Sequence, residues 1–300
     1  MKRKVVKLGP ATLVISLPAK WVQRLNIQAG AEVELEEKDS SLTISLEKEY
    51  KREKETLNLS EHESLLKRIF VSKYLKGVDE IEVEFDSLEK SRLIQKRVDE
   101  LIGMEVVDQS RNSLTVSDMG TSKEDNFDNI MKRVFYLLNS LSDETLKAVK
   151  NKETDLEYLE DLEKNLNKFT DYCFRILNKK GYPDVRKTAV LYCILYLLEE
   201  VGDKYKKLVS FIQKNKLKLN QDLIVLFTNI NEYNKNMQKL FLKFSFEGAK
   251  NLAKERDLII KSINKKLSFS KVTSEVVVLK HFENITENII KIMGQLLNIN

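Results

Sequence analysis

The sequence of 300 residues predicts a multidomain α+β protein made of three parts. Short segments of alternating apolar and polar residues, separated by turns, fill residues 1–50 and predict a small β module. Residues 51–120 combine helical and strand patterns, whereas residues 121–300 show the helical period alone. The chain contains 9 glycines and 3 prolines, a low content that fits a largely helical protein.

The N-terminal β module is predicted from four alternating segments, residues 5–9, 12–18, 31–37 and 41–47. A helical turn at Pro18–Leu25 begins with a helix-compatible proline and places its apolar residues on one face. Turns are expected at Gln28–Gly30 and Asp39–Ser41. These elements bury too little apolar surface to be stable alone, so an intertwined dimer is expected.

Residues 1–31 contain no aspartate or glutamate, although the net charge of the whole chain is only +5. A single sign of charge on a small β segment indicates a surface that faces nucleic acid. The candidate DNA-contacting residues are Lys2, Arg3, Lys4, Lys7, Lys20 and Arg24. The alternative is a pure dimerisation domain whose lysines are only solvated.

The run Leu13–Pro18, followed by Trp21, Leu25, Gly30 and the strand Val33–Glu37, resembles the AbrB/MazE/SpoVT family of swapped-hairpin domains. The resemblance covers residues 1–50. It implies an interlocked β dimer that binds DNA through basic residues near the first strand. Lys2, Arg3, Lys4 and Lys7 of both copies would then flank a twofold axis, with Lys20 and Arg24 as second-rank candidates. No Asn or Gln stands out for base readout, so the DNA sequence stays open.

Residues 51–120 predict a linker and a small αβαββ unit. Lys51–Glu55 alternates in charge and is expected to be solvated. Ser60 and Glu63 form a predicted capping box, which opens a helix that carries Leu65, Ile69 and Phe70 and ends at Gly77. The later elements are a strand at Ile81–Phe85, a helix at Leu88–Ile102 and a hairpin of Glu105–Val107 with Leu114–Val116. A spacer or a second dimerisation element is the expected role.

Residues 121–300 predict six helices in two related halves. The helices are expected near residues 123–150, 153–179, 184–214, 220–248, 250–267 and 272–298. Residues of the third helix recur in the sixth at a constant offset of 84: Leu195, Glu199, Val201, Asp203 and Leu208 correspond to Leu279, Glu283, Ile285, Glu287 and Ile292. A repeat of this length implies two three-helix bundles packed side by side.

The repeat preserves two pairs of acidic residues, Glu199 with Asp203 and Glu283 with Glu287. A spacing of four residues puts both carboxylates of a pair on one helical face, next to leucines and valines. Partly buried like charges are costly unless a metal ion or a basic side chain neutralises them. Both kinds of neutralisation are therefore considered.

The segment Leu198–Asp203 resembles the metal-associated helix of the PhoU family, which consists of two three-helix repeats. Arg68–Asp79 and Leu101–Val106 further resemble the archaeal subgroup that joins an AbrB-like domain to PhoU-like bundles. The resemblance implies iron- or zinc-type clusters completed by acid pairs on adjacent helices. The corresponding pairs here are Glu163 with Asn167 and Asp257 with Lys261, which depart from that pattern.

The candidate metal ligands are Glu163, Glu199, Asp203, Glu283 and Glu287. Carboxylate ligands of this kind suit iron, manganese or magnesium. The favoured alternative is that these acids pair with lysines, and Lys261 could neutralise Glu283 or Glu287 directly. Tyr192 and Tyr196 and the group Phe241, Phe244 and Phe246 are expected in helix packing. His281 lies beside the second acid pair and is a possible ligand, but the neighbouring Lys280 favours a surface role.

A cytoplasmic location is expected. The only cysteines, Cys173 and Cys193, occupy apolar helical patterns and predict two buried thiols, which favours a reducing compartment. The longest apolar run, Ala189–Leu198, is too short to cross a bilayer. The N-terminus has the outline of a signal peptide, but Lys7 and Pro10 interrupt its apolar stretch.

These observations predict a homodimeric regulator that binds DNA and is not an enzyme. By resemblance, its bundles relay a signal linked to phosphate uptake, through a partner such as a phosphate transporter or a signalling protein. One alternative is a PhoU-type adaptor of a transporter or sensor whose N-terminal domain only dimerises. Another is a carboxylate-bridged metal bundle, which the lack of Glu-x-x-His pairs disfavours.

Overall fold

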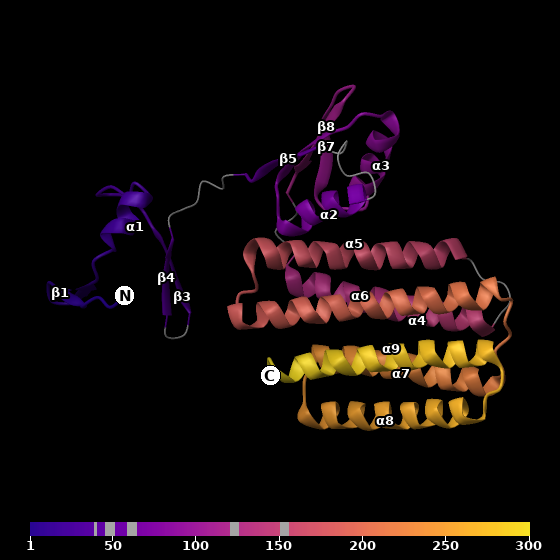
Figure 1. Cartoon of the computed structure of the whole chain (residues 1–300). Coiled ribbons are helices and arrows are strands. Elements are labelled where there is room, and N and C mark those ends of the chain that lie inside the picture. Colours follow the sequence, from indigo (N-terminus) through magenta and orange to yellow (C-terminus); the bar gives the residue numbers. More distant parts are fainter. Residues whose placement is uncertain (39–40, 46–51, 59–64, 121–125, 151–155) are drawn as a thin grey trace. The chain divides into compact units, whose positions relative to one another are not determined.

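The computed structural model describes residues 1–38, 41–45, 52–58, 65–120, 126–150 and 156–300 (Figure 1). The chain forms two compact units, Met1–Lys51 and Arg52–Asn300. The first unit contains short strand pairs and one short helix, and the second contains a mixed sheet followed by long helices. The α+β multidomain class predicted from the sequence is confirmed.

The first unit is built from two separate antiparallel strand pairs and a short helix. The strands are β1 (Val6–Leu8) with β2 (Thr12–Val14), and β3 (Glu34–Lys38) with β4 (Ser41–Ser45). Between β2 and β3 along the chain, α1 (Ala19–Arg24) follows Pro18, whose φ of −65° suits a helix start. β2 ends four residues before the predicted limit at Pro18, and the predicted turn at Asp39–Ser41 lies partly outside the described residues.

The second unit begins with a four-stranded sheet in the order β5-β6-β8-β7. β5 (Lys54–Asn58) runs parallel to β6 (Glu80–Glu84), whereas β8 (Ser113–Asp118) is antiparallel to both β6 and β7 (Met104–Gln109). The prediction of a solvated linker at Lys51–Glu55 is wrong from Lys54 onward, because this segment enters an edge strand. The sequence does not predict this strand because β5 is mostly polar and Leu57 is its single buried side chain.

Two helices pack on this sheet, α2 (Leu66–Lys76) and α3 (Leu88–Val98). Their buried side chains, including Phe70, Tyr74 and Ile94, join Ile81 and Val83 of β6 in one core. Ser87 caps α3 by accepting a hydrogen bond from the Lys90 amide at 3.4 Å. The predicted capping residues Ser60 and Glu63 lie outside the described residues, and Leu65 precedes α2 instead of belonging to it.

Six long helices follow in the described part of the chain. They are α4 (Phe127–Lys150), α5 (Leu156–Lys180), α6 (Val185–Lys214), α7 (Gln221–Leu242), α8 (Phe246–Phe269) and α9 (Thr273–Leu297). The predicted limits agree closely except between α7 and α8, where the predicted helix at 220–248 ends early. Ser245 causes this break, because its hydroxyl accepts a hydrogen bond from the Gly248 amide at 3.0 Å and so caps α8.

The six helices form two three-helix bundles, α4–α6 and α7–α9. Contacts of α4 with α7 and of α6 with α9 join the bundles, and α5 and α8 lie on opposite outer sides (Figure 1). The buried positions of α6 recur in α9 at the same offset of 84: Leu195, Leu198, Val201, Gly202, Tyr205 and Leu208 match Leu279, Phe282, Ile285, Thr286, Ile289 and Ile292. The sequence repeat is therefore a repeat of the core-facing side of one helix.

Helix α5 is attached to the α/β part by a buried network of charges. Arg175 is only 3% exposed and donates to the carbonyl oxygens of Tyr74 (2.7 Å) and Val78 (2.9 Å), and to the Asp118 carboxylate (2.6 Å). One turn later, Lys179 pairs with Asp79 and Asp118. Because each charge has a close partner, this network holds α2 and β8 in a defined position on α5.

Gly77 allows this close approach. It ends α2 with a φ of +104°, in the left-handed region that favours glycine. A Cβ atom at this position would lie 3.1 Å from the Lys179 Cβ of α5. The turn after α2 therefore favours glycine, and a side chain at this position would also press against α5.

None of the helices within the described ranges is both long enough and apolar enough to span a membrane.

Cys173 is buried as expected, but the prediction of a buried thiol at Cys193 is wrong, because this residue is exposed on α6.

Candidate functional site

The basic residues of the first unit form the first candidate site. Lys2, Arg3 and Lys4 precede β1, Lys7 lies within it, and Lys20 and Arg24 lie on α1. All six side chains are exposed, and none of them forms an ion pair with another described residue. Their charge is therefore available to a partner with negative charge.

The two hairpins of this unit carry uncovered apolar faces. In β3 and β4, the register pairs Leu35 with Ile44 and Glu37 with Leu42, so the three apolar side chains share one face. Leu35 is 61% exposed and Leu42 is 54% exposed. Val6 and Leu8 of β1 are likewise exposed, and no residue of this unit is buried among those described. The described part of a single copy therefore forms no core.

The acidic residues of the first bundle are a second candidate site, and most of them have cationic partners. Glu163 on α5 is 4% exposed, and it accepts hydrogen bonds from Lys206 Nζ at 2.9 Å and from Asn167 Nδ2 at 2.8 Å. Asp203 pairs with Lys207 at 3.1 Å. Glu199 lies half-buried one turn before Asp203 and has no ion pair with any residue in the described ranges.

In the second bundle the equivalent acids also pair with basic residues. Glu283 contacts Lys280 at 2.6 Å on α9, and Glu287 pairs with Arg256 of α8. The suggested neutralisation by Lys261 is wrong, because Lys261 is exposed and makes neither contact. His281 is partly exposed, and its ring packs against Phe211 with centroids 6.0 Å apart. Its Nδ1 atom is buried without a hydrogen-bond partner.

These contacts bear on the predicted metal ligands. Where the structure describes the chain, no three or more His, Cys, Asp or Glu side chains come together as a group able to hold a metal ion. Four of the five candidate acids, all except Glu199, are held by lysine or arginine side chains. The metal site remains a prediction, and this arrangement of donors fits the alternative of ion pairs better than it fits a metal.

Comparison with protein families concerns the first unit. Residues 6–55 match the model of the family described as antidote-toxin recognition MazE, bacterial antitoxin. This segment is MazE-like. It contains both hairpins and α1 and ends within β5, so it includes Lys7, Lys20 and Arg24, whereas Lys2, Arg3 and Lys4 lie just before it. No curated protein and no solved structure matches the chain.

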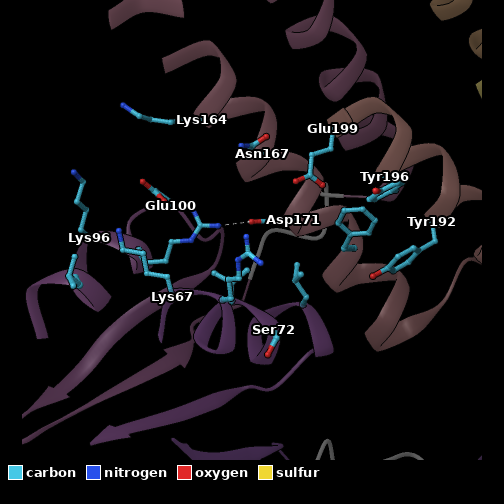
Figure 2. A pocket seen from close by; sticks show the side chains of 16 residues that line it. Lys67, Ser72, Lys96, Glu100, Lys164, Asn167, Asp171, Tyr192, Tyr196 and Glu199 are labelled. Carbon is cyan, nitrogen blue, oxygen red and sulfur yellow. Dashed lines mark hydrogen bonds and ion pairs between the residues drawn. The ribbon is translucent and has the colours of Figure 1, made fainter. Parts of the chain in front are cut away.

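Outside the MazE-like segment, a pocket of about 680 Å³ opens between α2 and α3 on one side and α5 and α6 on the other (Figure 2). Tyr192 and Tyr196, which were predicted to pack inside the bundle, are instead 37% and 55% exposed and line this pocket. Phe174 lies against Tyr192 with ring centroids 4.5 Å apart. Glu199 is the one predicted site residue among the side chains that line the pocket.

Two carboxyl groups in the pocket have raised pKa values. Burial, followed by the charge of Asp171, raises the pKa of Glu199 from 4.5 to about 7. Burial also raises the pKa of Asp171 from 3.8 to about 6, although Arg97, 3.1 Å away, acts in the opposite direction. Near neutral pH, Glu199 is therefore present in both its neutral and its charged form.

Sequence reasoning missed most of this pocket. The basic side chains of α2 and α3 form no motif in the sequence, and α5 and α6 are far from them along the chain. The pocket forms because Arg175 and Lys179 bring α5 against α2. Tyr192 and Tyr196, four residues apart, line the pocket together with Glu199, but their sequence pattern fits bundle packing equally well.

Proposed function

We propose that this chain is a homodimeric DNA-binding regulator and not an enzyme. In this proposal, two copies of the MazE-like segment form one β dimer that contacts DNA. The observation that carries the proposal is the combination, in one small unit, of six exposed cations without ion pairs to described residues and apolar hairpin faces that the described part of a single copy leaves uncovered. The match to the MazE family supports it.

The physical action of such a dimer follows from its charges. Lysine and arginine side chains bind phosphate oxygens and release counterions from the duplex, which supplies affinity without regard to sequence. Twofold symmetry presents the basic residues of both copies together, so a pseudo-palindromic site is expected. The phosphate-binding residues in this scheme are Lys2, Arg3, Lys4 and Lys7, with Lys20 and Arg24 as further candidates.

The helical part receives the regulatory signal in this proposal. The two three-helix bundles have the architecture that the resemblance to PhoU-like proteins implies, and this supports a role in phosphate uptake or homeostasis. A phosphate transporter or a signalling protein is the proposed partner. Mapping of bound DNA across the genome with phosphate plentiful and scarce tests this role, and enrichment at transporter promoters under either condition is the expected result.

The DNA-binding proposal is tested by a salt titration with a labelled duplex. For about six phosphate contacts, the logarithm of the association constant falls with the logarithm of salt concentration with a slope of about −5. Combined replacement of Lys2, Arg3, Lys4 and Lys7 by alanine makes the slope shallower by about 0.9 for each phosphate that is no longer neutralised. The matched control replaces Lys250, Lys254, Lys261 and Lys265, four exposed lysines of α8, and leaves the slope unchanged.

Two outcomes would contradict this proposal. If the whole chain shows no salt-dependent affinity for duplex DNA, the adaptor alternative is favoured, in which the MazE-like segment only dimerises. If the α8 control lowers affinity as much as the N-terminal variant, DNA binding belongs to the helical part instead.

A further inference from the structure

The pocket between the α/β part and the first bundle has two chemically different ends. Lys67, Lys96 and Lys164 lie toward one end, and Tyr192, Tyr196 and Glu199 lie toward the other (Figure 2). Its volume of about 680 Å³ falls within the range of about 300–1,000 Å³ that is typical of small-molecule sites. A ligand that fills the pocket would meet positive charge at one end and aromatic rings at the other.

Some of the cations at the basic end have no ion-pair partner among the described residues. Five cationic side chains line the pocket, Lys67, Arg68, Lys96, Arg97 and Lys164. Arg97 is engaged by Glu100 and Asp171, and Lys164 pairs with Asp161 on its own helix at 3.2 Å. Lys67, Arg68 and Lys96 form no ion pair with any described residue, so they can bind an anion.

The aromatic end is held in place by packing. Phe174 is buried in α5 and contacts the ring of Tyr192, which fixes the orientation of that ring. Tyr196 follows one helical turn later on the same face of α6 and is more than half exposed. Exposed tyrosine faces of this kind offer a stacking surface for a planar ring.

Glu199 supplies the polar group at the aromatic end. It follows Tyr196 on α6 and is half-buried in the pocket wall, without an ion-pair partner among the described residues. A half-buried carboxyl group of this kind is stabilised by a ligand that donates N–H groups to it. The amino and imino groups of a nucleobase are such donors.

We propose that this pocket binds a nucleotide, with the base against Tyr192, Tyr196 and Glu199 and the phosphates on the lysines of α2 and α3. A nucleotide combines a planar ring that bears N–H donors with a polyanionic end, which are the two features that the pocket separates. The ligand would contact both the α/β part and the first bundle. The inference is independent of DNA binding by the MazE-like segment.

The proposal is tested by calorimetric titration of the whole chain with AMP, ADP, GMP and GDP, and with adenosine and pyrophosphate as fragments. At least one nucleotide is expected to bind more tightly than either fragment. The Tyr196→Ala variant weakens binding of that nucleotide by at least about fivefold, as expected when one stacking partner is removed. Combined Lys67→Ala and Lys96→Ala substitution weakens nucleotide binding more than adenosine binding.

Matched variants separate this site from other causes. Tyr136→Ala removes a tyrosine of α4 that is 67% exposed outside the pocket, and Lys250→Ala with Lys254→Ala removes two exposed lysines of α8. Neither changes nucleotide affinity. The variant without Lys2, Arg3, Lys4 and Lys7 retains nucleotide binding, so weak phosphate binding by the MazE-like segment is distinguished from pocket binding.

The proposal is overturned if none of the nucleotides binds at millimolar concentration. It is equally overturned if pyrophosphate binds as tightly as every nucleotide, because the pocket would then be an anion site without base recognition. Loss of binding in the N-terminal variant together with retention in Tyr196→Ala would assign the bound nucleotide to the first unit.

Discussion

At the scale of single residues, Glu199 links the pocket to the stability of the fold. Its pKa is about 7 in the folded protein and 4.5 when unperturbed, so between these values the folded state holds more protons than the unfolded state. The free energy of unfolding therefore falls as pH rises through this window. Glu199→Gln removes this contribution, and the variant gains stability relative to the original protein as pH increases.

Urea unfolding at a series of pH values measures this effect. Below pH 4.5 the two proteins are expected to be nearly equal, because both side chains are then neutral. Above pH 7 the variant is expected to be more stable by about 1–2 kcal/mol, a value reduced to allow for solvent screening of a partly exposed group. A difference between the two proteins that does not change with pH would contradict the raised pKa.

At the residue scale, the sequence identifies candidate site residues by their local pattern, and their roles stay predictions. The acid pairs were found because their spacing places them on one face, and the six basic residues because no acid accompanies them. Tyr192 and Tyr196 were misassigned because a tyrosine on an apolar helix face gives the same pattern whether a helix covers it or a pocket exposes it. Only the position of α2 distinguishes the two cases.

At the scale of elements, Gly202 shows how closely α5 and α6 pack. A Cβ atom there would overlap the Leu166 side chain, which is fully buried on α5, and would lie 3.8 Å from Leu141 of α4. At Gly294 of α9, an added Cβ atom meets nothing within 4 Å. Replacing each glycine by alanine therefore separates two contributions to stability: helix propensity, which acts at both positions, and overpacking, which acts at Gly202 alone.

Gly294→Ala is expected to stabilise the protein by about 0.4–1 kcal/mol, because alanine restricts the unfolded chain and favours the helix. Gly202→Ala brings the same gain, but overpacking costs about 1–3 kcal/mol, so the net effect is neutral to destabilising. Urea unfolding of both variants gives the comparison. If Gly202→Ala is as stabilising as Gly294→Ala, the contact between α5 and α6 is looser than the structure indicates.

Element boundaries were predictable where a local signal marks them. Gly77 ends α2 as expected, with a positive φ value. The predicted end of the next helix at Gly103 is wrong, because α3 ends at Val98 and Gly103 lies in the turn before β7. Strand β5 was missed because its stability comes from parallel pairing with β6 across α2, which its own polar sequence does not reveal. The break between α7 and α8 was predicted too late in the sequence. The helical pattern continues through this segment, but the Ser245 cap starts α8 at Phe246.

At the scale of the whole molecule, the offset of 84 residues predicted the two-bundle architecture, because the repeated residues are those that α6 and α9 bury. The docking of the α/β part on α5 could not be predicted in this way. It depends on buried charges such as Arg175 and Asp79, which the sequence does not distinguish from solvated ones. The pocket, which this docking creates, was unpredictable for the same reason.

The MazE-like segment is expected to dimerise the molecule. Its hairpins expose Leu35 and Leu42 and it has no buried residue among those described, so a second copy must supply the missing core. Sedimentation of the whole chain is therefore expected to give a dimer. Residues 52–300, which form a compact unit of their own, are expected to sediment as a monomer.

Leu35→Asp places a charge on the apolar hairpin face and is expected to shift the whole chain toward monomer, since a charge cannot be buried there without a partner. Leu258→Asp, at a leucine of α8 that is 66% exposed, provides the control and leaves the dimer intact. A dimer formed by residues 52–300 alone would move the dimer interface to the second unit. The basic residues of two copies would then no longer be brought together by the hairpins, and the symmetric DNA contact proposed for them would lack a physical basis.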